Sequence, residues 1–467
     1  MILDNKSIKK IHCLGIGGIG VSALAEFFFK KGYYVTGSDR QDNKNIHYLK
    51  KIGIDISLDN HIISQDIDLV IYTSAISHDN PGFLAAQKLG IPLISRGKIL
   101  ADIMQGYYSI AVAGSHGKTT TSGILAHLLL TDGRDPSFIV GGILNNQKSP
   151  AHLGCSDYLV AELDESDRSF LFAYPDIAIV TSIDTDHLEA YGGDFGRLQQ
   201  ALLSFLHHVP LQSTVILCID DENLRTLLPN IKRNILTYGF HPSAMIRASN
   251  FKANGLLSHF TVERLGAAPL SLTLNMPGHH NALNALASVS AATLFQIKDD
   301  VLVKGLSNFP GMERRFYYWG SIPVQGGGQA LLIEDYGHHP NEIRAVLLTV
   351  RQIWPARRLV VAFQPHRYTR TRDLINEFVE VLVEADICLL LDIYSSSEPP
   401  VDGISSRILY QILSKNTKKK SIFVPKIDLL PRHLQKIAQP NDVIILQGAG
   451  NIGSTAKCLM SDTLTIA

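Results

Sequence analysis

The stretch SIAVAGSHGKTTTSGILAHLLL, residues 109–130, decides the fold. A short apolar run leads into a glycine turn and then into a helix pattern, which is how a parallel strand–helix–strand unit begins. The residues between the expected strand and helix are Gly114, Gly117, Lys118 and Thr119. Backbone N–H groups of such a turn converge on an anion, and the helix N-terminus adds partial positive charge. The sequence therefore predicts a phosphate-binding loop in an α/β protein.

The phosphate loop also carries the side chains that a nucleotide site needs. Lys118 can reach the β- and γ-phosphates, and the Thr119 hydroxyl can bind magnesium. The usual P-loop has an earlier glycine at the place of Val112, so this loop is a shortened variant. An ordinary strand–helix turn is the structural alternative, and the sequence GKTT in this context argues against it.

Similar α/β units precede and follow the phosphate loop, beginning near Ile11 and near Met312. A chain of 467 residues exceeds the usual size of one hydrophobic core, so two or three domains are expected. Short alternating strands between about Met245 and Asn275 predict an antiparallel addition to the central sheet. The predicted domains are a Rossmann-like one at 1–106, a central P-loop one at 107–311 and a second Rossmann-like one at 312–467.

Acidic residues and a histidine follow two later strands of the central unit. Glu162 ends one apolar run, and Asp184, Asp186 and His187 follow another. In a parallel sheet, ligands gather at the carboxyl ends of the strands. Any one of these residues alone is more often a helix cap or a solvated loop residue. Two such clusters after a phosphate loop favour a metal and nucleotide site.

The first unit has its own glycine motif, G-x-G-x-x-G at Gly15, Gly17 and Gly20, with Asp39 about twenty residues later. This pattern matches the dinucleotide fingerprint, so an NAD-dependent dehydrogenase is a rival hypothesis. A nucleotide-sugar diphosphate against the helix N-terminus satisfies the same geometry. The motif alone does not choose between these ligands.

A second G-x-G-x-x-G occurs late in the chain, at Gly448, Gly450 and Gly453. Glycines at this spacing also allow a helix to pack closely against a strand. A tight packing turn is therefore at least as good an interpretation as a ligand site, and both stay open.

Composition excludes several classes of function. Lys plus Arg and Asp plus Glu number 43 each, and the densest basic run, residues 415–420, is expected to be a solvated loop and not a nucleic-acid patch. Five dispersed cysteines without metal spacing fit a reducing cytosol. No apolar run is long enough to cross a bilayer, and no signal segment is evident. We expect a soluble, cytoplasmic protein without nucleic-acid or membrane partners.

Together these segments resemble the Mur ligase family over nearly the whole chain. The motifs that carry the resemblance are, in order, GIGGIG, GSD, GSHGKTT, ELDESD, DTDH, GHHNALNA, ERRF, EDYGHHP and QPHRYTRT. The last two are the most specific. The resemblance implies three domains, which bind a UDP-sugar, ATP with Mg²⁺, and an amino acid. It further implies an enzyme that joins L-alanine to UDP-N-acetylmuramic acid, and we expect that enzyme to be a monomer or homodimer.

The resemblance also implies roles for single residues. Those expected to bind ATP are Gly114, Ser115, His116, Gly117, Lys118, Thr119, Thr120, Asn281, Asn284, Arg315 and Asp335. The expected magnesium ligands are Thr119, Glu162 and His187. Contacts to the UDP-sugar are expected from Gly15, Gly17, Gly18, Ile19, Gly20, Ser38, Asp39, Ser74 and Arg96. The region that receives L-alanine and the muramoyl carboxylate contains Tyr336, His338, His366, Arg367 and Arg370. Catalytic roles are expected for Lys118, Glu162, His187, Arg315, Asp335 and His338.

The implied chemistry activates a carboxylate. ATP phosphorylates the lactyl carboxylate of the muramic acid, and the amine of L-alanine then attacks the acyl phosphate. Either His338 or His366 could take the amine proton. Three alternatives remain open: a related ligase that recycles a tripeptide, a dehydrogenase, and a non-catalytic nucleotide-binding regulator. The sequence HRYTRT favours L-alanine over the tripeptide, and a dehydrogenase leaves GSHGKTT without a role.

Overall fold

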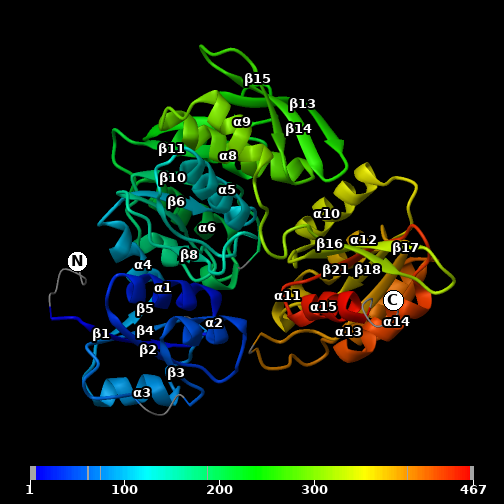
Figure 1. The fold of residues 1–467 in the computed structure, drawn as a ribbon, viewed down its shortest axis with the longest axis horizontal. Coiled ribbons are helices and arrows are strands. Elements are labelled where there is room, and N and C mark those ends of the chain that lie inside the picture. Colours follow the sequence, from blue (N-terminus) through cyan, green and yellow to red (C-terminus); the bar gives the residue numbers. More distant parts are fainter. Residues whose placement is uncertain (1–6, 60–62, 74, 187, 397, 463–467) are drawn as a thin grey trace. The chain divides into compact units, whose positions relative to one another are not determined.

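A computed structural model describes residues 7–59, 63–73, 75–186, 188–396 and 398–462. The chain divides into two compact units (Figure 1). Apart from two short segments that belong to the second unit, the first unit ends at Met312. The second unit contains everything from Glu313 onward. The first predicted domain boundary, at Gly106, falls between a helix and a strand of the first unit and stays a prediction.

The first sheet has five parallel strands in the order β3-β2-β1-β4-β5. Its strands are β1 (Lys10–Leu14), β2 (Tyr34–Ser38), β3 (Asp55–Ser57), β4 (Leu69–Tyr72) and β5 (Leu93–Ser95). Its helices are α1 (Ile19–Lys30), α2 (Lys44–Ile52), α3 (Pro81–Lys88) and α4 (Arg96–Met104). The apolar residues of α1 that the helical spacing singles out, Val21, Leu24, Phe27 and Phe28, are all buried. The predicted Rossmann-like unit is therefore confirmed.

The central sheet has ten strands in the order β15-β14-β13-β12-β11-β10-β6-β9-β7-β8. Its strands are β6 (Tyr108–Ala113), β7 (Ser137–Ile139), β8 (Ala151–His152), β9 (Tyr158–Glu162), β10 (Ile177–Val180), β11 (Thr214–Cys218), β12 (Asn234–Gly239), β13 (Ile246–Asn254), β14 (Leu257–Arg264) and β15 (Leu270–Leu274). Its helices are α5 (Lys118–Thr131), η2 (Ser169–Phe172), η3 (Leu188–Tyr191), α6 (Phe195–Leu206), α7 (Glu222–Leu227), η4 (Leu228–Asn230), α8 (His279–Leu294) and α9 (Asp299–Ser307). The predicted addition lies at β13–β15, and its first strand joins β12 through a parallel pair.

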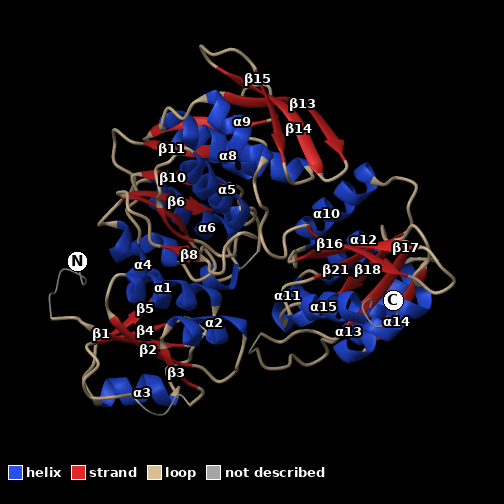
Figure 2. Ribbon diagram, viewed as in Figure 1, coloured by secondary structure: helices blue, strands red, loops and turns tan. Residues whose placement is uncertain are grey.

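The third sheet has six strands in the order β16-β17-β21-β18-β19-β20, all parallel except the hairpin of β16 and β17. Its strands are β16 (Tyr317–Pro323), β17 (Gln329–Asp335), β18 (Leu359–Phe363), β19 (Ile387–Leu391), β20 (Lys420–Val424) and β21 (Val443–Gln447). Its helices are α10 (Pro340–Ile353), α11 (Tyr368–Asp373), α12 (Ile375–Leu382), α13 (Ser406–Asn416), η5 (Ile427–Leu429), α14 (Leu430–Ile437), η6 (Asn451–Gly453) and α15 (Ser454–Asp462) (Figure 2).

The basic run at residues 415–420 was predicted to be a solvated loop, but only its middle part is one. Helix α13 extends to Asn416, and the edge strand β20 begins at Lys420. Lysines are common on edge strands because their charge prevents pairing with another chain. The apolar run of β20 is only three residues long, Ile422 to Val424, so it is a weak signal in the sequence.

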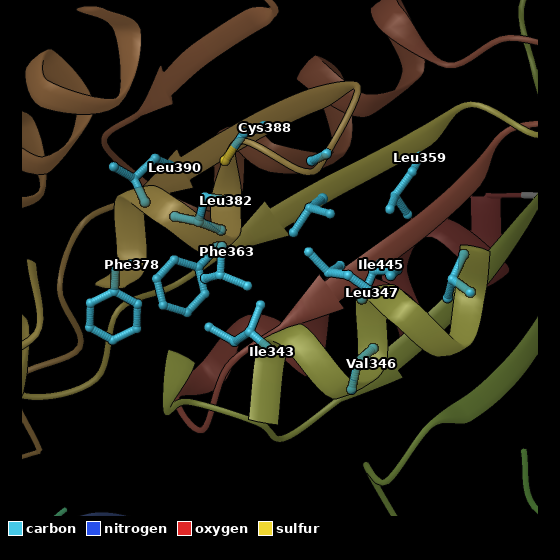
Figure 3. Packing of buried hydrophobic residues seen from close by; sticks show 14 of the residues in the cluster. Ile343, Val346, Leu347, Leu359, Phe363, Phe378, Leu382, Cys388, Leu390 and Ile445 are labelled. Carbon is cyan, nitrogen blue, oxygen red and sulfur yellow. The ribbon is translucent and has the colours of Figure 1, made fainter. Parts of the chain in front are cut away.

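Side chains of the third sheet alternate between two cores. Ile333, Val361 and Ile445 face helices α10, α12 and α13, and Figure 3 shows this packing around Phe363 and Phe378. The neighbouring residues of the same strands belong to a second cluster, which includes side chains of α14 and α15. Covering both faces of a parallel sheet is what lets its strands be continuously apolar. Within the part of the chain that the structure describes, no helix is both long and apolar enough for a membrane span.

Candidate active site

The phosphate loop connects the end of β6 to the start of α5. Gly114 and Gly117 have positive φ angles of +123° and +81°, a conformation that glycine adopts without steric cost. A Cβ atom at Gly117 would collide with the side-chain oxygen of Asn284. The N–H groups of Ser115 and His116 donate to Ser182. The groups left for an anion are therefore those of the first turn of α5, which have no intrahelical acceptor.

Two of the predicted magnesium ligands lie in contact. The Thr119 hydroxyl donates to Glu162 Oε1 at 3.0 Å, and the N–H of Gly141 donates to Glu162 Oε2 at 2.6 Å. A hydroxyl and a carboxylate are oxygen donors of the type that Mg²⁺ prefers. The third predicted ligand, His187, lies outside the described residues. Nearby, His116 contacts Asp184, with 3.1 Å between Nε2 and Oδ2.

Lys118 lies partly buried at the start of α5, where its ammonium group contacts Glu165. Its Nζ lies 2.8 Å and 3.0 Å from the two carboxylate oxygens of Glu165, and 2.6 Å from the Gly114 carbonyl. Burial lowers the pKa of Lys118, but the charges of Glu165, Asp164 and Glu162 outweigh it, so the pKa lies above its usual value. Burial raises the pKa of the Glu165 carboxyl to about 7, against the opposing effect of Lys118. Sequence reasoning missed Glu165.

Asn281 and Asn284 lie on one face of α8, next to the phosphate loop. Asn284 donates to Asn281 Oδ1 at 3.3 Å and accepts from the Thr121 hydroxyl at 3.4 Å. Both asparagines are buried. The structure thus brings this predicted pair to the phosphate loop.

The first glycine motif shapes a loop between β1 and α1. The N–H of Gly17 donates to Asp39 Oδ2 at 2.9 Å, and the N–H of Gly15 donates to the Ser38 carbonyl at 2.8 Å. Gly18 precedes the first residue of α1, Ile19, so the loop ends at a helix N-terminus. The Asp39 carboxylate therefore fixes the backbone of the glycine loop by accepting from Gly17. Ser74, a predicted contact to the UDP-sugar, lies outside the described residues.

Arg96 connects this glycine loop with the acidic segment after β9. A Cβ atom at Gly20 would lie 2.6 Å from Arg96 Nη1, so the guanidinium covers the first turn of α1. The same side chain pairs with Asp164 at 3.2 Å and Asp167 at 3.5 Å. Burial raises the pKa of Asp164, but Lys118 and Arg96 outweigh this effect and hold it below its usual range. The chain beside this pair is tightly packed, since a Cβ atom at Gly97 would collide with Ser169.

His12 is a second residue that sequence reasoning missed. It lies in β1 with Nδ1 2.8 Å from the Thr36 hydroxyl and Nε2 3.1 Å from the Ser38 hydroxyl. Burial lowers the pKa of His12 from 6.5 to about 4. The imidazole therefore stays neutral and orients Ser38, a predicted contact to the UDP-sugar.

The buried imidazole of His12 makes folding stability depend on pH. The unfolded chain protonates this histidine at a higher pH than the folded chain does. Its contribution is therefore complete above pH 6.5 and is lost as the pH falls toward 4. Between about pH 7 and about pH 5, we expect the wild type to lose about 2 kcal/mol more unfolding free energy than His12→Gln. Urea unfolding at both pH values measures this difference, and equal losses in the two proteins would contradict it.

In the second unit, Asp335 is held in one orientation by backbone and side-chain donors. Its Oδ2 accepts from the N–H of Phe316 at 2.9 Å, and its Oδ1 accepts from the N–H of Gly337 at 2.7 Å. Gln447 Nε2 also donates to Asp335 Oδ1 at 2.8 Å and to the Gly337 carbonyl at 2.7 Å. Gln447 was not predicted, because it looks like an ordinary strand end in the sequence.

Tyr336 and His338 follow Asp335 and lie beside Arg315. The Arg315 guanidinium lies over the Tyr336 ring, 5.0 Å from its centre. Glu342 is 3.8 Å from Arg315 and 3.5 Å from His338 Nδ1. The structure thus brings Arg315 and His338 to one carboxylate of α10, with Tyr336 against both of them.

His366 and Arg370 belong to the same cluster. The rings of His338 and His366 are 5.7 Å apart, and Arg370 Nη1 lies 3.4 Å from His366 Nδ1. Arg367 precedes the first residue of α11 and has a positive φ of +72°, and its guanidinium is 3.8 Å from Glu398. Arginines provide the planar, permanently charged partner that a carboxylate needs.

The late glycine motif has a packing role. Arg314 donates to the carbonyls of Gly448 and Gly450 at 2.7 Å and 2.9 Å, and to Glu334 Oε1 at 2.6 Å. A Cβ atom at Gly453 would collide with Glu334, and one at Gly450 with Gln364. The glycines therefore allow the turn to wrap around an internal ion pair.

Comparison with known proteins extends over all three sheets. Three family models match in succession: the Mur ligase family catalytic domain at residues 10–108, the Mur ligase middle domain at 112–292 and the Mur ligase glutamate ligase domain at 315–450. The chain belongs to the Mur ligase family. Membership confirms the resemblance inferred from the motifs and removes support from the dehydrogenase hypothesis.

Other Mur ligases are similar over nearly their whole length. The UDP-N-acetylmuramate–L-alanine ligase of Coxiella burnetii (strain Dugway 5J108-111) is 50% identical over 463 residues, which are 98% of this chain and 99% of that protein. The crystal structure of the UDP-N-acetylmuramate-alanine ligase of Thermotoga maritima has a TM-score of 0.83 and 29% identity, and covers 98% of this chain and 100% of its own. A murein peptide ligase of Psychrobacter arcticus 273-4 shares the fold, with a TM-score of 0.72 and 23% identity. The match covers 98% of this chain and 99% of that ligase.

Proposed function

We propose that this Mur ligase joins L-alanine to UDP-N-acetylmuramic acid with the energy of ATP, a step of peptidoglycan synthesis. The observation that carries the proposal is the phosphate loop, where Lys118 and the contact between Thr119 and Glu162 lie at the start of α5. The substrates follow from the 50% identity with an L-alanine ligase over nearly the full length of both chains.

Lys118 and the first turn of α5 bind the terminal phosphates of ATP. The lactyl carboxylate attacks the γ-phosphorus, the bond to ADP breaks, and an acyl phosphate forms. Positive charge and N–H donors around the moving phosphoryl group stabilise the charge that it carries. Thr119 and Glu162 would hold Mg²⁺, which supplies further charge neutralisation on the phosphates. Together these groups convert the carboxylate, whose oxygen is a poor leaving group, into an acyl phosphate, from which phosphate can leave.

The residues of the second unit fit the amino acid. Arg370 offers a guanidinium to the carboxylate of L-alanine, and Arg315 lies beside Tyr336 in the same cluster. The amine attacks the acyl carbon, and the tetrahedral intermediate then expels phosphate and leaves the amide. His338 and His366 both lie close enough to this cluster to take the amine proton.

An assay of phosphate release tests the proposal. Purified protein with ATP, Mg²⁺ and UDP-N-acetylmuramic acid should release phosphate only when L-alanine is added. The tripeptide L-alanyl-γ-D-glutamyl-meso-diaminopimelate is the matched alternative amine, and its preference over L-alanine would identify a recycling ligase. Phosphate release without any amine, or tight ATP binding without turnover, would refute ligation.

A further inference from the structure

Glu165 is a buried carboxylate close to the expected ATP phosphates. Its side chain is 7% exposed, and both of its oxygens contact Lys118 Nζ. Lys118 is the cation that pairs with this carboxylate. The backbone of Glu165 is fixed as well, since its carbonyl accepts from the Tyr191 hydroxyl at 2.7 Å. The carboxylate is therefore held firmly against the phosphate loop.

Lys118 is correspondingly occupied within the protein. Its ammonium group has three N–H bonds, and it contacts the Gly114 carbonyl at 2.6 Å as well as both oxygens of Glu165. A further contact, to the Ser115 carbonyl, is longer at 3.4 Å. Every donor of the ammonium group thus has an acceptor within the protein.

Phosphates and Glu165 must compete for the same ammonium group. If Lys118 turns toward a phosphate, Glu165 loses its partner, and its carboxylate must either stay charged close to a second anion or take up a proton. Leaving a buried charge unpaired is costly. The ion pair therefore stabilises the nucleotide-free loop and opposes binding of the nucleotide.

We propose that Glu165 is a positioning residue that holds Lys118 in the nucleotide-free loop and draws it back from ADP after phosphoryl transfer. The proposal rests on the proposed function, because it requires a nucleotide in this loop. Glu165 thus weakens nucleotide binding and speeds product release. A residue with only a structural role would, when replaced, weaken binding of every ligand.

The variant Glu165→Gln keeps the shape of the side chain and removes its charge. We expect its Kd for ADP with Mg²⁺, measured by calorimetry on the whole protein, to fall about tenfold. KM for ATP and kcat should fall together, because ADP leaves more slowly. The nucleotide-free variant should also melt at a lower temperature than the wild type, and ADP should restore most of that loss.

Two further variants complete the experiment. Glu189→Gln removes the same charge from an exposed residue of η3 and should leave the Kd for ADP unchanged. Glu165→Asp keeps the charge but shortens the side chain, so it should lower the Kd by less than Glu165→Gln. If Glu165→Gln does not fold, the test is whether Glu165→Asp has a lower Kd for ADP than the wild type.

The outcomes separate the two proposals. If the wild type binds ADP and both Glu165 variants bind it equally well or more weakly, the positioning role is wrong and the ligase proposal stands. If the wild type itself does not bind ADP with Mg²⁺, both proposals are wrong. A lower Kd in Glu165→Gln, together with an unchanged Glu189→Gln, supports the positioning role.

Discussion

Lys118→Ala is expected to lower kcat/KM for phosphate release about a thousand-fold. The ammonium group is the side-chain cation at the start of α5, where the γ-phosphoryl group should pass. Removing it deletes a charge that acts mainly on the transition state. The measurement is the L-alanine-dependent release of phosphate at saturating UDP-N-acetylmuramic acid.

Loss of stability has to be separated from loss of chemistry in Lys118→Ala. The substitution leaves Glu165 buried without its partner, which destabilises the fold. The double variant Lys118→Ala/Glu165→Gln removes both charges and should recover the melting temperature without recovering activity. Lys232→Ala, at an exposed position, is the control for removing a lysine. Normal turnover in the folded double variant would contradict the assignment of Lys118.

Arg314→Met is expected to reduce the free energy of unfolding by about 3–5 kcal/mol. Arg314 pairs with Glu334, whose side chain is 4% exposed, and it donates to the carbonyls of Gly448 and Gly450. Without the guanidinium, Glu334 keeps Trp319 as a donor but loses its counter-charge. Chemical denaturation of the whole protein measures the difference.

The double variant Arg314→Met/Glu334→Gln is the matched control for this ion pair. It removes the buried charge that the single variant leaves behind, so it should recover part of the lost stability. Arg372→Met removes an exposed arginine from the same unit and should change the stability by less than about 0.5 kcal/mol. A single variant as stable as Arg372→Met would show that the late glycine turn does not need Arg314.

The sequence predicted the three α/β units because each begins with an apolar run and a glycine turn. It missed β16 and β20, which lie at opposite edges of the third sheet. Edge strands lie beside solvent and pair on one side only, so their apolar runs are shorter than those of β18 or β21. The sequence also gave no indication that β13 pairs in parallel with β12, since register depends on contacts between distant residues.

Within the site, residues in recognisable motifs were predicted and their supporting partners were not. The motif GSHGKTT identifies Lys118, and the structure places Thr119 against Glu162. Glu165 lies in the same acidic segment as Glu162, but only the fold shows that it reaches Lys118. His12 and Gln447 are single polar residues in apolar strands, and nothing in their local sequence reveals the hydroxyls or carboxylate that they contact.

The close fit of Gly97 against Ser169 limits how this protein could be recombined with its relatives. Any side chain at position 97 would collide with the short helix η2, which follows the acidic segment of the central sheet. If only the first hundred or so residues were exchanged for those of another ligase, the new surface around residue 97 would not fit η2 of this protein. A functional chimera needs residues 96–97 and 164–169 to come from the same parent.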